Sequence, residues 1–108
     1  MYITSADQLE VFCKNLQSAE ILAVDTEFVR EKTYFHRVGL IQVSSGEHFA
    51  AIDPVLLSDL TPLLELFKDP SKLKIFHAAR QDLEILVRMC GQIITPVFDT
   101  QIAAALVG

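Results

Sequence analysis

The chain has 108 residues, 51% of them hydrophobic, and a formal net charge of −5. This length allows one domain around one core, and the high apolar content excludes a disordered chain. The acidic balance argues against a protein that binds nucleic acid through basic surface charge. It leaves open a protein whose clustered carboxylates hold divalent cations that meet a phosphate.

We expect a cytoplasmic protein without a membrane span. No apolar run reaches the roughly 18 residues that cross a bilayer, and residues 1–10 lack the basic start of a signal peptide. Cys13 and Cys90 fall at apolar positions of helical patterns, which favours buried free thiols over a disulfide.

The first element expected is a helix. Ser5 and Gln8 have the spacing of a capping box, with Thr4 or Ser5 as the N-cap. An apolar stripe at helical spacing follows, made of Leu9, Phe12, Cys13 and Leu16. Residues 21–24 are then a continuous apolar run, typical of a buried strand, which continues to residue 29.

Two further strands are expected in the first half of the chain. Residues 30–37 are polar and basic and indicate a connection, and residues 38–43 form the second strand. The turn at residues 45–47 is short, so the third strand at 48–52 should pair with the second as an antiparallel hairpin.

The second half alternates helices with strands. Thr61 followed by Pro62 indicates a helix start, with Thr61 as the N-cap. Strands are expected at residues 73–77 and 96–99, separated by a helix that ends at Gly91. The apolar stripes are Leu60, Leu63, Leu64 and Phe67 for the first helix, and Leu83, Leu86, Val87 and Cys90 for the second.

This order predicts an α/β fold with a mixed sheet: three antiparallel strands, then parallel strands with crossover helices. No linker, repeat or like-charge block divides the chain, so residues 1–108 should form one unit. A last helix should begin at Thr100, and its apolar face (Ile102, Ala105, Leu106) has nothing after it to pack against. We therefore expect a truncated piece of a larger architecture.

Asp25 and Glu27 are the sharpest chemical feature. They lie two residues apart at the end of an apolar strand, so both side chains should point to one face, with Cα atoms about 6.5–7 Å apart. Two carboxylates in a buried setting require a proton, a cationic partner or a metal, and Mg²⁺ or Mn²⁺ suits hard oxygen ligands. The alternative is a solvated strand end where both acids meet water, and spacing alone does not choose between them.

Three other candidates lie at or after predicted strand ends. Asp82 follows the strand at residues 73–77, at the carboxyl end where α/β sheets place their ligands, although a helix-start acid is the simpler interpretation. Asp99 has helix N-cap as its default role, with a metal role as the alternative. A histidine such as His77 is more often packed than catalytic, but its position near Asp82 keeps it as a candidate.

A basic segment follows Asp25 and Glu27. It contains Arg30, Lys32, Tyr34, Phe35, His36 and Arg37. Basic and aromatic side chains beside paired carboxylates can hold phosphates and stack bases, whereas charge alone favours a solvated loop. No glycine-rich nucleotide loop, serine nucleophile elbow or zinc-binding cysteine pair is present in the sequence.

Together these motifs resemble the DEDD superfamily of 3′→5′ exonucleases, and most nearly its ribonuclease D family. Residues 21–30 (ILAVDTEFVR) resemble the first motif, and residues 38–43 (VGLIQV) the strand that follows it. Residues 76–84 (FHAARQDLE) are similar to the second motif, and residues 98–104 (FDTQIAA) to the segment after it. Each motif is weak alone, but their order and spacing fit across essentially the whole chain.

The resemblance implies a ribonuclease H-like fold and a hydrolase that uses two divalent ions, Mg²⁺ or Mn²⁺. By matching position, Asp25, Glu27 and Asp82 take the catalytic and metal-binding roles. Phe28 is a candidate to pack against the terminal base, and His77 is a second substrate-binding candidate. The substrate would be the 3′ end of an RNA, including transfer RNA precursors, and the product a nucleoside 5′-monophosphate.

One part of the family pattern is missing. The third motif, a tyrosine followed four residues later by an aspartate, should lie beyond Gly108, as should a downstream helical domain that binds nucleic acid. We therefore expect this 108-residue chain alone to bind metal weakly and hydrolyse little or nothing, and the full-length protein to be a monomer. The alternatives are a DNA-directed exonuclease of the same superfamily and a non-catalytic nucleic-acid-binding module of the same fold.

Overall fold

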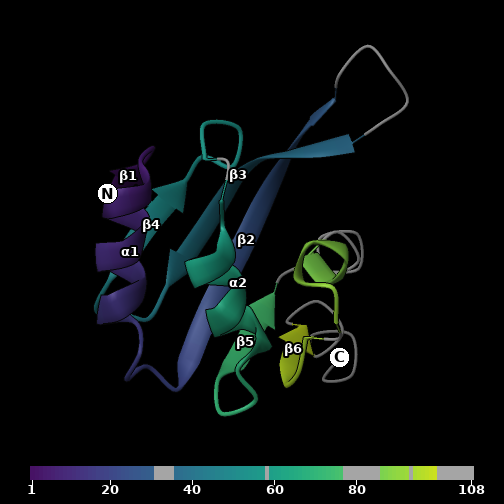
Figure 1. Ribbon diagram of the computed structural model, residues 1–108. Coiled ribbons are helices and arrows are strands. Elements are labelled where there is room, and N and C mark those ends of the chain that lie inside the picture. The colour runs from purple at the N-terminus through teal and green to yellow at the C-terminus, as the bar shows by residue number, and fades with distance from the viewer. Residues whose placement is uncertain (31–35, 58, 77–85, 93, 100–108) are drawn as a thin grey trace.

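The computed structural model describes residues 1–30, 36–57, 59–76, 86–92 and 94–99. Within these residues six strands form one sheet in the order β1-β4-β3-β2-β5-β6 (Figure 1). The strands are β1 (Tyr2–Ile3), β2 (Ile21–Arg30), β3 (His36–Ser44), β4 (Phe49–Ile52), β5 (Leu73–Phe76) and β6 (Val97–Asp99). The helices are α1 (Ala6–Asn15) and α2 (Thr61–Lys68), and residues 86–90 are also helical.

The sheet is mixed, as the sequence predicts. β2 pairs antiparallel with β3, and β3 pairs antiparallel with β4. On the other side of β2, β5 and then β6 continue the sheet in parallel. The predicted α/β class, with an antiparallel half and a parallel half, is confirmed.

The core lies between the sheet and the helices. Both α1 and α2 lie on the same face of the sheet in Figure 1, and their apolar stripes belong to one buried cluster with the inward side chains of the strands. The helices contribute Leu9, Phe12, Cys13, Leu63, Leu66 and Phe67, and the sheet contributes Leu22, Val24, Ile41, Val43, Ala50, Ile52 and Phe76. The predicted stripe of the first helix is buried throughout, including Leu16.

The start of α1 also follows the prediction. Ser5 is the N-cap, and its Oγ accepts a hydrogen bond from the backbone N–H of Gln8 at 3.3 Å. The side chain of Gln8 in turn accepts from the backbone N–H of Thr4 at 3.0 Å. These two bonds satisfy backbone donors that a helix start would otherwise leave unpaired.

Several boundaries differ from the predictions. The predicted connection at residues 30–37 is shorter, because β2 runs to Arg30 and β3 begins at His36. The N-cap of α2 is Leu60 rather than Thr61, whose hydroxyl instead donates to Asp59. The short strand β1 has no counterpart in the prediction. Its two residues are held by parallel pairing with β4, which no local pattern could indicate.

Two buried lysines anchor the amino-terminal end of β5. The Nζ of Lys72 donates to the carbonyl oxygens of Leu16, Gln17 and Ala19, just past the end of α1. The Nζ of Lys74 donates to the carbonyl oxygens of Asp69 and Thr95 at 2.7 and 2.8 Å. Burial lowers the pKa of Lys74, because the charged form loses solvation.

The two cysteines are free, Cys13 buried and Cys90 partly buried, in agreement with the prediction of unpaired thiols. Residues 86–90 precede Gly91, whose φ of +73° is the left-handed conformation that ends helices, as predicted. In the described part of the chain no helix is long and apolar enough to cross a membrane. The predicted last helix, from Thr100 onward, lies outside the described residues.

Candidate active site

Asp25 and Glu27 lie in the middle of β2, on the face of the sheet that α1 and α2 leave open. Both side chains are exposed, whereas the alternate residues Val24 and Thr26 are buried on the helix side. Strand alternation therefore turns both carboxylates to the same side, with Cα atoms about 6.5–7 Å apart. The paired arrangement that the spacing predicts is present in the structure.

The strand register places this pair at the carboxyl end of the parallel strands. Val24 pairs with Phe76, the last residue of β5, and Phe76 pairs with Asp99, the last residue of β6. Asp25 therefore stands one residue beyond the row in which β5 and β6 end. This end of a parallel sheet is where α/β proteins gather their ligand-binding groups.

An irregularity in β3 lies directly beside Glu27. Glu27 pairs with Leu40, but the next residue, Phe28, pairs with Val38, so Gly39 is left over as a β-bulge. Bulges bend a strand and re-aim the neighbouring side chains, and they are common near functional sites. The sequence signal was available, because an isolated glycine inside a predicted strand often marks a bulge.

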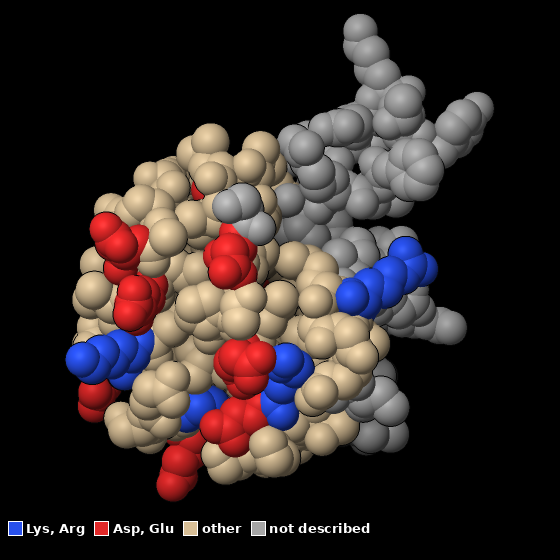
Figure 2. All heavy atoms as spheres, viewed as in Figure 1, with Lys and Arg blue, Asp and Glu red and all other residues tan. Residues whose placement is uncertain are grey.

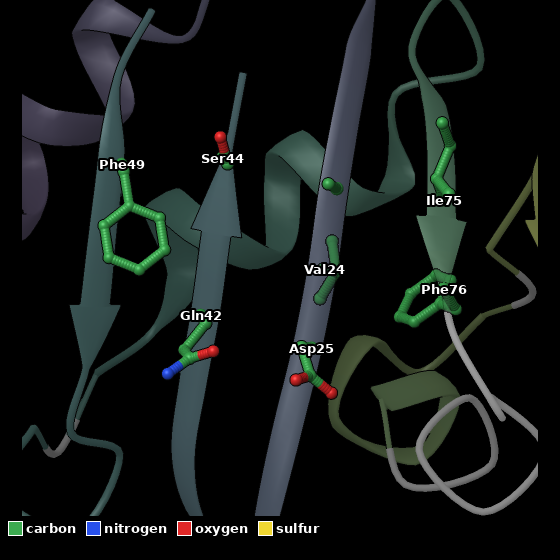
Figure 3. Close-up of a pocket in the computed structure, with 8 residues that line it drawn as sticks. Val24, Asp25, Gln42, Ser44, Phe49, Ile75 and Phe76 are labelled. Atoms are coloured by element: carbon green, nitrogen blue, oxygen red, sulfur yellow. The ribbon is translucent and has the colours of Figure 1, made fainter. Parts of the chain in front are cut away.

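A shallow groove lies next to Asp25 on the open face. Its volume is about 240 Å³, and its lining is mainly apolar. Figure 3 shows Asp25 on β2 beside Gln42 on β3, with Phe49 on β4 and Ile75 on β5 at the flanks. The sequence did not indicate this groove, because it depends on how four strands pair, including β5 with β2, which are far apart in the chain.

The other predicted site residues are not placed by the structure. His77 and Asp82 lie outside the described residues, and so do the side chains of Phe28 and Asp99. The last described residue of β5, Phe76, pairs with Val24, the residue before Asp25. The side chains of the predicted basic cluster likewise lie outside the described residues; they are Arg30, Lys32, Tyr34, Phe35, His36 and Arg37.

The two described carboxylates suit a divalent metal ion but do not complete a site. They offer hard oxygen ligands on an exposed face, and within the described part of the chain neither has a hydrogen-bond or ion-pair partner. Among the described residues, no three side chains that could bind a metal come together. Asp82 is outside the described residues and is therefore not included in that statement. Asp25 and Glu27 could therefore supply part of a coordination shell that needs further ligands.

The face of the sheet that α1 and α2 cover carries few basic side chains that could bind a nucleic acid backbone. Figure 2 shows acidic side chains distributed over this face, with fewer basic ones between them and no continuous basic surface among the described residues. A protein that grips phosphates with lysine and arginine needs such a surface. On this face, the described residues therefore form no surface that would hold phosphates directly.

The whole chain, residues 1–108, matches the family model described as a 3′-5′ exonuclease. The chain is 43% identical over 106 residues to ribonuclease D of Escherichia coli (strain K12), a match that covers 98% of this chain and 28% of that protein. It is 44% identical over 108 residues to ribonuclease D of Zymomonas mobilis, with 98% and 28% covered. The chain thus spans less than a third of the length of these curated relatives.

Solved structures agree with the sequence matches. The crystal structure of Escherichia coli RNase D, an exoribonuclease involved in structured RNA processing, matches with a TM-score of 0.91 and 42% identity, covering 100% of this chain and 29% of that one. The catalytic core of RRP6 from Trypanosoma brucei matches with a TM-score of 0.84 and 28% identity over 94% of this chain and 29% of that one. These matches confirm the ribonuclease H-like exonuclease fold. Since the family model spans all 108 residues, the chain belongs to the 3′-5′ exonuclease family.

Proposed function

We propose that this chain is the first part of the exonuclease domain of a 3′→5′ exoribonuclease of the ribonuclease D type. The observation that carries the proposal is the carboxylate pair, Asp25 and Glu27, on one face of β2 at the carboxyl end of the parallel strands. The family match over the whole chain and the 43% identity to a ribonuclease D support it.

Asp25 and Glu27 would hold two divalent cations, Mg²⁺ or Mn²⁺, with Asp82 as a further ligand. When bound, such ions offset the negative charge that develops on a phosphodiester and lower the pKa of a coordinated water. The protein's part is to fix the carboxylate oxygens on a rigid strand. The buried neighbours Val24 and Thr26 provide that rigidity, together with the pairing of β2 with β3 at both carboxylates and with β5 as far as Val24.

The substrate proposed is an RNA 3′ end, including those of transfer RNA precursors, and the product is a nucleoside 5′-monophosphate. Phe28 would pack against the terminal base and His77 would contact the substrate. The similar Escherichia coli protein is an exoribonuclease involved in structured RNA processing, which supports RNA over DNA as the substrate. The whole protein is proposed to be a cytoplasmic monomer.

The direction and product of hydrolysis test this proposal. The whole protein, of which residues 1–108 form part, would be incubated with Mn²⁺ and RNA labelled at its 5′ end, and the released nucleotides separated by chromatography. The expected result is a ladder that shortens from the 3′ end, with nucleoside 5′-monophosphates as products. Hydrolysis should stop with EDTA and should be blocked by a 3′-phosphate on the RNA.

Other outcomes would replace the proposal. Equal shortening of a matched DNA strand would move the assignment to a DNA-directed or non-selective exonuclease. Binding of RNA without any shortening, by a folded protein that takes up Mn²⁺, would indicate a non-catalytic binding module of the same fold.

A further inference from the structure

Gln42 stands directly opposite Asp25 on the neighbouring strand. The register of β2 and β3 pairs these two residues, and it pairs Glu27 with Leu40. Residues opposite each other in an antiparallel pair have Cβ atoms about 4.5–5.5 Å apart and point to the same side of the sheet. Figure 3 shows the side chains of Asp25 and Gln42 next to each other on adjacent strands. The carboxylate of Asp25 therefore has an amide within reach, whereas Glu27 faces an apolar side chain.

The other described neighbours of Gln42 offer its amide no acceptor. On the other side of β3 it pairs with Ala51, which has no polar side chain. Two residues along β3, the Oγ of Ser44 already accepts a hydrogen bond from the backbone N–H of Gly46 at 3.1 Å. Within the described part of the chain the amide of Gln42 has no hydrogen-bond partner. Among the described residues directly beside it, Asp25 is thus the one whose side-chain oxygens can accept from it.

An amide suits a carboxylate that binds a cation. Gln42 is half-buried, so its NH2 group has lost part of its water and gains from an acceptor in the protein. The amide turns about its last side-chain bond and can present this group to Asp25. An ionised carboxylate has about four lone-pair positions, so a bound cation leaves room for a donor. A lysine or arginine would also donate, but its charge would repel a divalent cation, which an uncharged amide does not.

We propose that Gln42 is a positioning residue for Asp25. Its side-chain N–H donates to one carboxylate oxygen of Asp25 and holds the carboxylate in the orientation in which it binds a divalent cation. This inference rests on the proposed function, because it takes Asp25 to be a metal ligand. Hydrogen-bond partners of metal ligands fix the orientation of the ligand, and their loss typically weakens metal binding by about 10–100-fold.

Binding of Mn²⁺ tests this role without requiring hydrolysis. The whole protein would be titrated with Mn²⁺ in the absence of RNA, and the free ion measured by its electron paramagnetic resonance signal. Gln42→Met removes the amide and keeps an unbranched side chain. Gln92→Met is the matched control, because Gln92 is exposed beside Lys68 and Asp69, near the amino-terminal end of β5. Asp25→Asn, in the same titration, tests the metal ligand itself.

The expected result is that Gln42→Met weakens Mn²⁺ binding by about tenfold or more, while Gln92→Met binds as the parent protein does. The midpoint of thermal unfolding without metal should be the same for both variants and the parent. Gln42→Leu repeats the measurement with a second apolar side chain if Gln42→Met disturbs the sheet. The KM for RNA at saturating Mn²⁺ should stay at the parent value, because Gln42 acts through Asp25.

Three results would contradict the role of Gln42 alone. Unchanged Mn²⁺ binding by Gln42→Met and Gln42→Leu, with weakened binding by Asp25→Asn, would remove this role and leave the proposed function intact. A raised KM for RNA with unchanged Mn²⁺ binding would make Gln42 a substrate contact. Weaker binding together with a lowered unfolding midpoint in both Gln42 variants would assign the effect to the stability of the sheet. Binding of Mn²⁺ by Asp25→Asn equal to that of the parent would contradict the proposed metal site, and this inference with it.

Discussion

Thr26 lies between the two candidate metal-binding residues but faces the opposite side of β2. It is 8% exposed, and its Oγ1 has no hydrogen-bond partner among the described residues. A buried hydroxyl without a partner costs about 1–3 kcal/mol of stability. The residue that separates Asp25 from Glu27 thus places a polar atom in an otherwise apolar row.

Replacing this hydroxyl by a methyl group tests that description. Thr26→Val keeps the shape and the β-branching, so we expect the free energy of unfolding to rise by about 1 kcal/mol. Urea denaturation of the variant and of the parent protein measures the change. A loss of more than about 1 kcal/mol would mean that the hydroxyl has a partner outside the described residues.

Cys13 gives a pH dependence with a defined sign. Burial on the inner side of α1 raises the pKa of its thiol from its ordinary value near 9 to about 11. The unfolded chain loses this proton first, so the stabilisation is fully present below pH 9 and is lost as the pH rises toward 11. We expect a loss of about 1–2 kcal/mol over that window, less than the shift alone would give because local opening admits solvent.

The comparison with Cys13→Ala isolates this effect. Denaturant unfolding at pH 8 and pH 10.5 should show a smaller fall in stability for the variant than for the parent protein. An equal fall in the free energy of unfolding for the two proteins would show that the thiol of Cys13 ionises in the folded state as readily as in the unfolded one.

At the scale of elements, α1 is fixed at both ends by side chains that lie outside it. Ser5 caps its start, and the buried ammonium of Lys72 collects three backbone carbonyls just beyond its end. The carbonyl of the C-cap residue Leu16 belongs to the helix end, where carbonyls carry partial negative charge that a cation satisfies, and the other two carbonyls lie in the segment that follows. Lys72 thereby joins the start of β5 to α1.

Lys72→Met should therefore destabilise the fold. The variant keeps the apolar stem but removes the donor from one buried and two partly buried carbonyls, so we expect a loss of about 2–4 kcal/mol. Lys14→Met is the matched control, since Lys14 is exposed in the last turn of the same helix. Its effect should stay below about 1 kcal/mol. Thermal or urea unfolding measures both, and equal losses would contradict this role for Lys72.

The elements that the sequence predicted correctly are those with a strong local pattern. The capping spacing of Ser5 and Gln8 and the apolar run at residues 21–24 each determine their structure within a few residues. β1 depends on a distant partner strand, which periodicity does not contain. The bulge at Gly39 has a local signal, the isolated glycine inside a predicted strand, but its place in the register is set by the pairing of β3 with β2. The same limit explains why the groove beside Asp25 could not be predicted.

In the candidate site, too, some features follow from the local sequence and others depend on distant strand pairing. The shared face of Asp25 and Glu27 follows from strand alternation alone and is present in the structure. Their position beside the end of β5 depends on parallel pairing between strands far apart in the chain, which the resemblance to a family implied and periodicity did not. The roles of Asp82, His77 and Phe28 remain predictions, since the structure does not describe their side chains.

At the scale of the whole molecule, the described residues bring together only Asp25 and Glu27 of the proposed site. Among the described residues, the two carboxylates are too few for a metal shell, and a mainly apolar groove lies beside Asp25. We therefore expect the isolated chain to show little or no metal-dependent hydrolysis of RNA, while the whole protein is active. Detectable 3′→5′ shortening by the purified 108-residue chain, lost on Asp25→Ala, would contradict this expectation.

The proposed metal-binding role of Asp25 is tested by the Mn²⁺-dependent shortening of 5′-labelled RNA by the whole protein with Asp25→Asn. Glu10→Gln, an exposed acid on α1 and so on the other side of the sheet, serves as the control that also removes one negative charge. We predict that Asp25→Asn lowers the rate by at least about a hundredfold, since it removes the negative charge of a proposed metal ligand, while Glu10→Gln leaves the rate unchanged. Equal rates for the two variants, with both proteins folded, would contradict the assignment of Asp25 to a catalytic metal site.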